Sequence, residues 1–144
     1  VENLNTYSIF IEGVDTVVMG WNTYHQIITE LSPKEWVYSG LASYVITHRT
    51  PAPAEQITFT QESPCSLVRR LKQEQGKAIW ICGGAAIIQP LILEDLIDEY
   101  YISIIPSILG DGIRLFGKMP AEMRLNLIST QTYNGITELV YSRR

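Results

Sequence analysis

The residues with the clearest chemical potential are Gly83 and Gly84, which follow the apolar run AIWIC and precede Ala85 and Ala86. Because glycine has no Cβ, an anion such as a phosphate can approach the backbone closely at this pair. If a helix begins there, its first N–H groups lack partners in the chain and its dipole attracts negative charge. The segment therefore predicts a phosphate-binding turn. The competing interpretation is a tight strand-to-helix turn without a ligand.

Two other short segments offer groups that suit the same ligand. The first consists of Gly20, Trp21, Asn22 and Thr23, and the second of Thr47, His48 and Arg49. The first puts a glycine at a corner and the Thr23 hydroxyl inside a first helical turn, and the second supplies a guanidinium that suits a phosphate monoester. The competing interpretations are a Thr23 hydroxyl bonded to its own helix, and a solvated loop at His48 and Arg49.

The apolar patterning predicts the elements that hold these segments. Strands are expected over residues 15–19, 43–47, 57–59, 78–82 and 97–106, and helices over residues 2–13, 22–31, 64–75 and 85–93. The third helix is the best marked, because Ser63 is a suitable N-cap and Pro64 occupies the first position. The C-terminal strands, 125–133 and 136–142, are joined by Asn134-Gly135, a strong hairpin signal.

Strands that alternate with helices and end in a hairpin predict a single α/β domain over residues 1–144. We expect a mixed, mostly parallel sheet with an antiparallel C-terminal hairpin at its edge. Ligands of such sheets bind beyond the carboxyl ends of the strands. Since residues 20–23, 47–49 and 83–86 each follow a predicted strand, we expect them to meet at one edge and to bind one ligand.

Composition and charge exclude several classes of function. The chain of 144 residues is 46% hydrophobic and 18% charged, which is typical of a globular protein. With a net charge of −4 and no basic cluster larger than residues 69–72, a nucleic-acid partner is not expected. No apolar run is long enough to span a membrane and no signal peptide is recognised. Cys65 and Cys82 form no spaced ligand set with His25 and His48, so we expect a cytoplasmic protein without a metal.

Four segments together resemble the dihydrofolate-reductase-like superfamily. They read DTVVMGWNTYHQI, SYVITHR, IWICGGAAII and LIDEYYISIIPSILGDGIRLF. The chain is most similar to the branch related to the reductase domain of the bifunctional deaminase/reductase proteins of bacterial riboflavin biosynthesis. The resemblance covers about residues 5–117, and its most specific part is the last segment, residues 96–116. It implies a three-layer fold with helices on both faces of a mixed sheet.

The resemblance also implies NADPH as the cofactor. Gly20 and Thr23 match the glycine and threonine of a first phosphate-binding turn, and Thr47 and Arg49 match positions that contact the adenosine phosphate. The pair Gly83-Gly84 matches a family glycine pair that is often joined by a cis peptide, with the N–H groups of Ala85 and Ala86 facing the pyrophosphate. The family commonly has basic residues where this chain has Trp21 and Asn22, so recognition of a 2′-phosphate is expected to depend on Arg49 and His48.

Family members begin with a strand and a loop that lines the nicotinamide and substrate pocket, reading roughly as an apolar run followed by Ser-Leu-Asp-Gly. No such segment precedes Val1. We expect that it was left out of this numbering, because a sheet without a central strand would expose the faces of its neighbours.

With NADPH as the cofactor that the resemblance implies, the expected function is reduction of a pterin-like or pyrimidine-like heterocycle, and the resemblance also suggests a homodimer. The alternative is a nucleotide-binding module that kept the scaffold and lost catalysis. No proton donor is assigned: Asp15 is expected to be a local cap, Ser103 a buried serine bonded to backbone, and Cys82 a buried apolar residue. Trp36 and Tyr38 are expected either to form a pocket wall or to pack.

Overall fold

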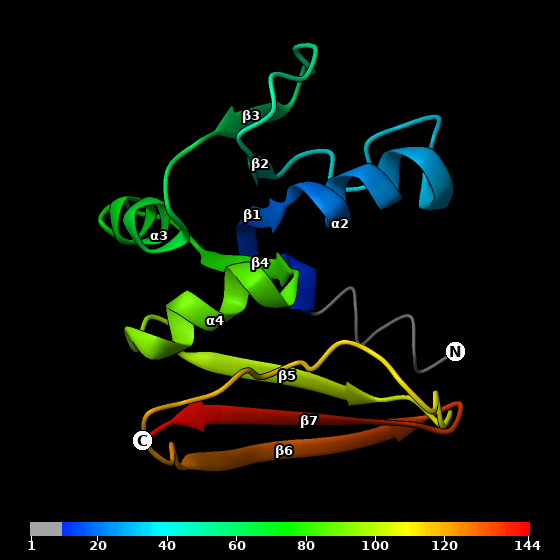
Figure 1. Ribbon diagram of the computed structural model, residues 1–144, viewed down its shortest axis with the longest axis vertical. Coiled ribbons are helices and arrows are strands. Elements are labelled where there is room, and N and C mark those ends of the chain that lie inside the picture. Colours follow the sequence, from blue (N-terminus) through cyan, green and yellow to red (C-terminus); the bar gives the residue numbers. More distant parts are fainter. Residues whose placement is uncertain (1–9) are drawn as a thin grey trace.

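The strands form two sheets, one parallel and one antiparallel (Figure 1). These elements come from a computed structural model, which describes residues 10–144. The parallel sheet has the order β3-β2-β1-β4, and the antiparallel sheet has the order β5-β7-β6. The parallel strands are β1 (Val14–Gly20), β2 (Ala42–Ile46), β3 (Ile57–Thr60) and β4 (Ala78–Gly83). The antiparallel strands are β5 (Glu99–Ile104), β6 (Leu125–Tyr133) and β7 (Ile136–Arg143).

Helices cover both faces of the parallel sheet, because its central strand β1 is apolar on both sides. On one face, Val17 and Met19 pack against Tyr24 of α2 (Trp21–Gln26), which continues into a π-helical segment (Ile27–Leu31). On the other face, Val18 packs against Leu67 of α3 (Pro64–Lys72). The last helix, α4 (Ala85–Leu93), packs against α3. The α/β fold class predicted from the sequence is confirmed.

The helix α3 begins as the sequence predicts. The Ser63 side chain accepts a hydrogen bond from the backbone N–H of Ser66, and Pro64 is the first helical residue. The helix ends at Lys72, before the predicted residue 75.

Two predicted elements need correction. The strand predicted over 97–106 is shorter, since β5 spans only Glu99–Ile104. The C-terminal hairpin and β5 form a separate sheet within the described part of the chain, whereas an edge of the parallel sheet was expected. The helix predicted over residues 2–13 lies mostly outside the described residues; its last turn, residues 10–12, is helical, and the Gly13 N–H donates to the Phe10 carbonyl.

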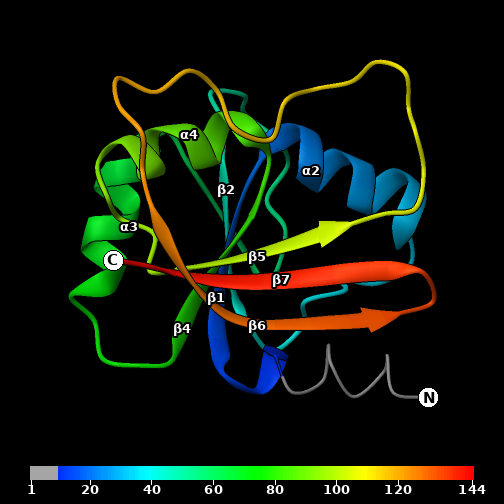
Figure 2. The same cartoon turned by 90° about the horizontal axis from the view of Figure 1, so that it is seen from below.

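Within the antiparallel sheet, β5 is connected to β6 by a long segment without regular structure, residues 105–124. Figure 2 shows this segment running past α4 before it enters β6. Gln89 of α4 holds it at two points: Gln89 Oε1 accepts from the Gly117 N–H (2.8 Å), and Gln89 Nε2 donates to the Lys118 carbonyl (3.1 Å). The segment therefore connects the antiparallel sheet to a helix that packs on the parallel one.

Among the described residues, no helix is both long enough and apolar enough to cross a lipid bilayer.

Candidate functional site

The three segments singled out from the sequence lie at one edge of the parallel sheet. They follow β2, β1 and β4, which are neighbours in that order. The register places Gly20 opposite Ile46 and Met19 opposite Gly83, so the three strands end at nearly the same level. Residues 20–23, 47–49 and 83–86 are thus brought together at the carboxyl edge, where ligands of parallel sheets bind.

The glycine pair lies directly beside the first turn of α2. The Gly83–Gly84 peptide bond is cis. A Cβ built on either glycine would have the Thr23 hydroxyl oxygen as its nearest neighbour, at 4.0 Å for Gly83 and 3.9 Å for Gly84. Gly84 has φ −84°, which any residue can adopt. Side-chain packing therefore leaves room at this pair, where Gly83 is buried and Gly84 is exposed.

Two helices begin at this edge without a capping side chain. The N-cap of α2 is Gly20 and that of α4 is Gly84, and neither helix has a side-chain cap or an acidic residue in its first turn. By contrast, α3 is capped by Ser63. The first N–H groups of α2 and α4, including those of Ala85 and Ala86, can therefore donate to an anion in the field of two helix dipoles.

Arg49 provides a cation at the same edge, and an aromatic ring holds it. Its guanidinium carbon lies 5.1 Å from the centre of the Trp21 ring, a cation–π contact. Its backbone N–H donates to the hydroxyl of Thr47 (3.0 Å), and Thr47 is buried. His25 stacks on Trp21 with ring centres 5.7 Å apart. The contact with Trp21 places the Arg49 charge next to the first turn of α2.

The remaining predicted residues differ in exposure and role. Asn22 and His48 are exposed at the rim. Packing also favours glycine at position 20, because a Cβ there would lie 3.1 Å from the Ile87 side chain of α4. Among the described residues, no hydrogen bond from the Thr23 hydroxyl to its own helix is seen, whereas Thr29 bonds to the His25 carbonyl in that way.

Trp36 and Tyr38 pack in the core and do not line this edge. Their rings lie 5.5 Å apart in an edge-on contact, and Trp36 Nε1 donates to the buried Ser43 hydroxyl (2.9 Å). Tyr38 lies 3.8 Å from Cys82 Sγ. Burial raises the pKa of the Cys82 thiol, and the Tyr38 hydroxyl offsets this only in part. The thiol is therefore protonated at neutral pH and is a poor nucleophile.

The polar groups considered as proton donors lie elsewhere or act locally. Asp15 accepts from the Lys77 N–H (2.8 Å) and is a local cap, as predicted. Ser103 was expected to be buried, but it is exposed, because β5 has one open face at this position. Asp111, a further carboxylate of the turn at residues 110–112, accepts from the Gly112 N–H (2.8 Å). No group of three or more metal-ligating side chains occurs in residues 10–144.

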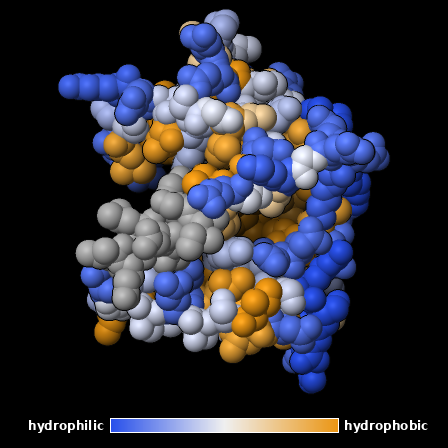
Figure 3. Space-filling view, turned by 180° about the vertical axis from the view of Figure 1, so that it is seen from behind, coloured by the Kyte–Doolittle hydropathy of each residue, from blue (hydrophilic) through white to orange (hydrophobic). Residues whose placement is uncertain are grey.

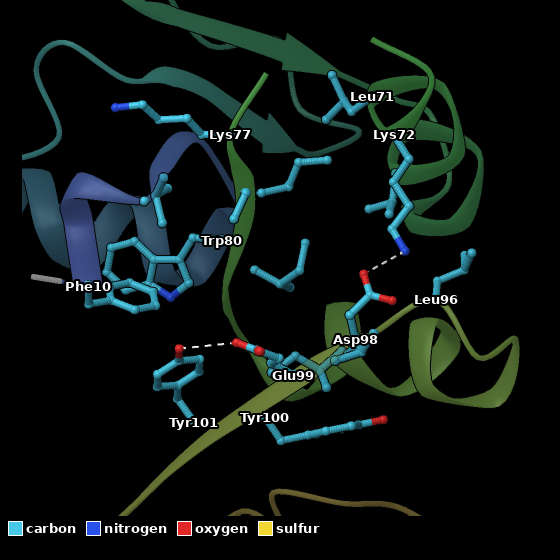
Figure 4. Close-up of a pocket in the computed structure, with 18 of the residues that line it drawn as sticks. Phe10, Leu71, Lys72, Lys77, Trp80, Leu96, Asp98, Glu99, Tyr100 and Tyr101 are labelled. Carbon is cyan, nitrogen blue, oxygen red and sulfur yellow. Dashed lines mark hydrogen bonds and ion pairs between the residues drawn. The ribbon is translucent and has the colours of Figure 1, made fainter. Parts of the chain in front are cut away.

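A large cavity lies away from this edge, between the two sheets (Figure 3). It measures about 780 Å³ and is lined by β4, β5, α3 and residues near Phe10 (Figure 4). The sequence interpretation missed it, because a gap between strands far apart in the chain leaves no local signal. None of the residues predicted to bind the cofactor lines it.

Three comparisons place the chain among known proteins. Residues 6–139 match the family model of the RibD C-terminal domain. The chain is 38% identical over 145 residues to the uncharacterized protein YwjB of Bacillus subtilis (strain 168), covering 99% of this chain and 81% of that protein. It superposes on a candidate riboflavin biosynthesis protein from Shewanella sp. PV-4 with a TM-score of 0.80 at 28% identity, covering 96% of this chain and 78% of that one.

A RibD structure from Acinetobacter baumannii shares the fold, with a TM-score of 0.63 at 17% identity. That match covers 91% of this chain and 47% of the other.

Proposed function

The chain belongs to the family of the RibD C-terminal domain, and from that premise we propose that it is an NADPH-dependent reductase of a pterin-like or pyrimidine-like heterocycle. The family is reductase-like. The substrate class comes from the resemblance noted in the sequence.

The observation that carries this proposal is the pair of uncapped helix N-termini at one sheet edge. A dinucleotide has a pyrophosphate that needs several N–H donors and no nearby carboxylate. The first turns of α2 and α4 offer such donors and contain no acidic residue, and no side chain crowds Gly83 or Gly84 between them. No other helix start in the described residues combines these features, since α3 is capped by its own serine.

The proposed roles follow from this placement. The N–H groups of Ala85 and Ala86 bind the pyrophosphate, the Thr23 hydroxyl adds a polar contact, and Arg49 binds the 2′-phosphate. The bound cofactor supplies the hydride, and the protein orients the reactants and excludes water.

The alternative, a nucleotide-binding module without turnover, is supported by one observation. Asp15 accepts from the Lys77 N–H, Asp98 pairs with Lys72 and Asp111 accepts from the Gly112 N–H, so each of these carboxylates is already engaged in another contact. Both functions require NADPH to bind at the same site. Only the reductase would also oxidise NADPH when a heterocyclic substrate is added.

The proposal is tested by titrating the protein with NADPH and NADH and following tryptophan fluorescence. NADPH should quench the emission, because Trp21 lies beside the proposed site. Arg49→Ala should weaken the binding of NADPH by about tenfold, or about 1.4 kcal/mol, and the binding of NADH by less than about twofold. Arg124→Ala, which removes an exposed arginine paired with Glu122, is the matched control and should change neither. Equal losses of affinity for both cofactors would contradict the proposed contact between Arg49 and the 2′-phosphate.

Trp21 is expected to favour NADPH over NADH indirectly, because its ring holds the Arg49 side chain in place. Trp21→Leu should lower the preference for NADPH over NADH by a few fold, whereas Trp21→Phe, which keeps an aromatic face, should keep most of it. The readout is the ratio of the two dissociation constants, which a general loss of folding would not alter. An unchanged ratio in Trp21→Leu would contradict the positioning role.

We also propose a homodimer, on the strength of the family resemblance. The exposed apolar side chains of the 105–124 segment, such as Ile108 (99% exposed) and Ile113 (94%), offer a surface for it. Light scattering should give twice the mass of the chain. A monomer at all concentrations would contradict it.

A further inference from the structure

The Trp21 ring, at the start of α2, contacts two basic side chains. The guanidinium carbon of Arg49 lies 5.1 Å from the ring centre. The His25 ring stacks on the same indole, with ring centres 5.7 Å apart and planes inclined by 27°. Because Trp21 and His25 are four residues apart in α2, they lie on one face of that helix. We call these three side chains the Trp21 stack.

The Trp21 stack places His25 close enough to act on an anion that Arg49 binds. Since both basic groups contact one ring, they are separated by about one Debye length or less, roughly 10 Å at 0.1 M salt. A charge on His25 is therefore only partly screened at the proposed 2′-phosphate position. The imidazole acts through its charge, and it needs no direct contact with the ligand.

The Trp21 stack has no carboxylate partner in the part of the chain that the structure describes. Residues 20–29 and 47–54 contain no aspartate or glutamate. Neither Arg49 nor His25 forms an ion pair within residues 10–144. A positive charge on this stack is therefore available to an anionic ligand.

The other titratable groups near α2 leave this charge largely uncompensated. The groups on α2, on the elements packed against it and in the loop after β2 are Asp15, Tyr24, Glu30, Tyr44, His48 and Arg49. Asp15 lies at the opposite end of β1, where it accepts from the Lys77 N–H. Glu30 is exposed beyond the end of α2. Burial raises the pKa of Tyr24, so its phenol is uncharged at neutral pH.

His25 gives the Trp21 stack two states of charge. Histidine is the side chain whose charge ordinarily changes between about pH 5 and pH 8. The His25 ring is exposed, so it exchanges protons with water. Its contact with Trp21 is kept when the imidazole gains a proton, because an aromatic face attracts a cation. The stack then carries two positive charges in place of one.

We propose that His25 is a further specificity-determining residue of the cofactor site: its protonated form adds a second positive charge beside Arg49 and strengthens the preference for a dinucleotide with a 2′-phosphate. The preference for NADPH over NADH therefore rises as the pH falls and His25 gains its proton. The pyrophosphate is common to both cofactors, so its response to the same charge largely cancels in the comparison. This inference rests on the proposed function, because it needs a dinucleotide at the carboxyl edge.

The test compares three proteins: the parent, His25→Gln, which lacks the charge, and His25→Lys, which keeps it. The dissociation constants of NADPH and NADH are measured in dilute buffer at about pH 6 and about pH 8. At the lower pH, the ratio of the NADH constant to the NADPH constant should be about two- to threefold higher in the parent than in His25→Gln. At the higher pH the two ratios should agree. His25→Lys should exceed His25→Gln by the same factor at both pH values.

Comparison at a single pH removes two other effects. The 2′-phosphate takes up a proton near pH 6, which weakens its attraction to any cation, and His48 titrates in the same range. Both are present in all three proteins, so they cancel between variants. Gln73→Lys is the matched control, because it adds the same charge to the exposed end of α3, on the other face of the sheet, and should leave the ratio unchanged.

Salt separates a charge effect from a packing effect. In about 0.5 M salt the ratios of the three proteins should converge, because screening weakens attraction between charges and leaves packing intact. Equal ratios for the parent and His25→Gln at pH 6, or a difference that persists at pH 8 or in high salt, would overturn the inference. If the parent binds NADPH in that case, the proposed function still stands. A parent that binds neither dinucleotide would contradict both.

Discussion

At the scale of single residues, Asp15 shows how one side chain fixes a distant turn. Its carboxylate accepts from the Lys77 N–H (2.8 Å) and from the Thr16 hydroxyl (3.0 Å). A Cβ on Gly76 would overlap the same carboxylate, so a larger residue there would displace the Asp15 side chain. The side chain thus joins the start of β1 to the turn before β4.

This contact makes stability depend on pH in a defined direction. The hydrogen bond from Lys77 lowers the pKa of Asp15 below the ordinary value of 3.8, so the stabilisation is present above about pH 4 and is lost as the pH falls further. Asp15→Asn should cost about 1 kcal/mol at neutral pH, since the group is largely solvated, and almost nothing near pH 2. Chemical denaturation of both proteins measures the difference, with Glu55→Gln as an exposed control. A difference that does not change with pH would contradict this account.

The two cysteines are predicted to be unreactive. Cys65 is buried, its thiol donates to the Pro90 carbonyl (3.4 Å), and burial raises its pKa to about 11. Burial also raises the pKa of Cys82. Near pH 8, a disulfide reagent should react with both thiols at a small fraction, about a hundredth, of the rate in the denatured protein. A fast-reacting Cys82 would reopen its role as a nucleophile.

At the scale of elements, the C-terminal hairpin depends on its two turn residues. Asn134 and Gly135 both have positive φ, 49° and 79°, which matches the twist of a two-residue turn between β6 and β7. The turn also contacts the end of β5, since a Cβ on Gly135 would approach Pro106 to 3.3 Å.

Gly135→Ala should therefore destabilise the protein by about 1–2 kcal/mol, from backbone strain and from the contact with Pro106. The control is Gly112→Ala, where the nearest atom would lie at 3.6 Å and φ is not positive. That variant should stay within about 0.5 kcal/mol of the parent. Thermal unfolding measures both, and equal effects would show that the turn geometry is not what matters.

At the scale of the whole molecule, side chains join parts that strand pairing leaves apart. Lys72 of α3 pairs with Asp98 before β5 (3.0 Å), and Asp98 also pairs with Arg143 of β7 (3.1 Å). Gln89 of α4 holds the 105–124 segment. These contacts attach the antiparallel sheet to the helices of the parallel one.

Gln89→Ala should loosen the 105–124 segment while leaving the sheets intact. Trypsin should then cleave after Arg114 and Lys118 about threefold faster or more, because local opening no longer breaks two hydrogen bonds. Gln73→Ala, on the end of α3, is the control. Unchanged cleavage would indicate that other contacts hold the segment.

The sequence by itself determined the elements whose signals are local. The N-cap at Ser63, the hairpin at Asn134-Gly135 and the turn at Gly83-Gly84 all depend on residues within a few positions of one another, where short-range sterics and hydrogen bonds decide the backbone. The order of strands and helices then placed the three candidate segments at the carboxyl edge.

Only the tertiary structure decided what depends on distant partners. Arg49 lies over Trp21, Asp15 bonds to Lys77, and β4 and β5 face each other across a groove. Each of these depends on which strand edges and faces meet after folding. That outcome follows from burial and from the pairing of backbone groups across the whole chain, and no short stretch of sequence records it.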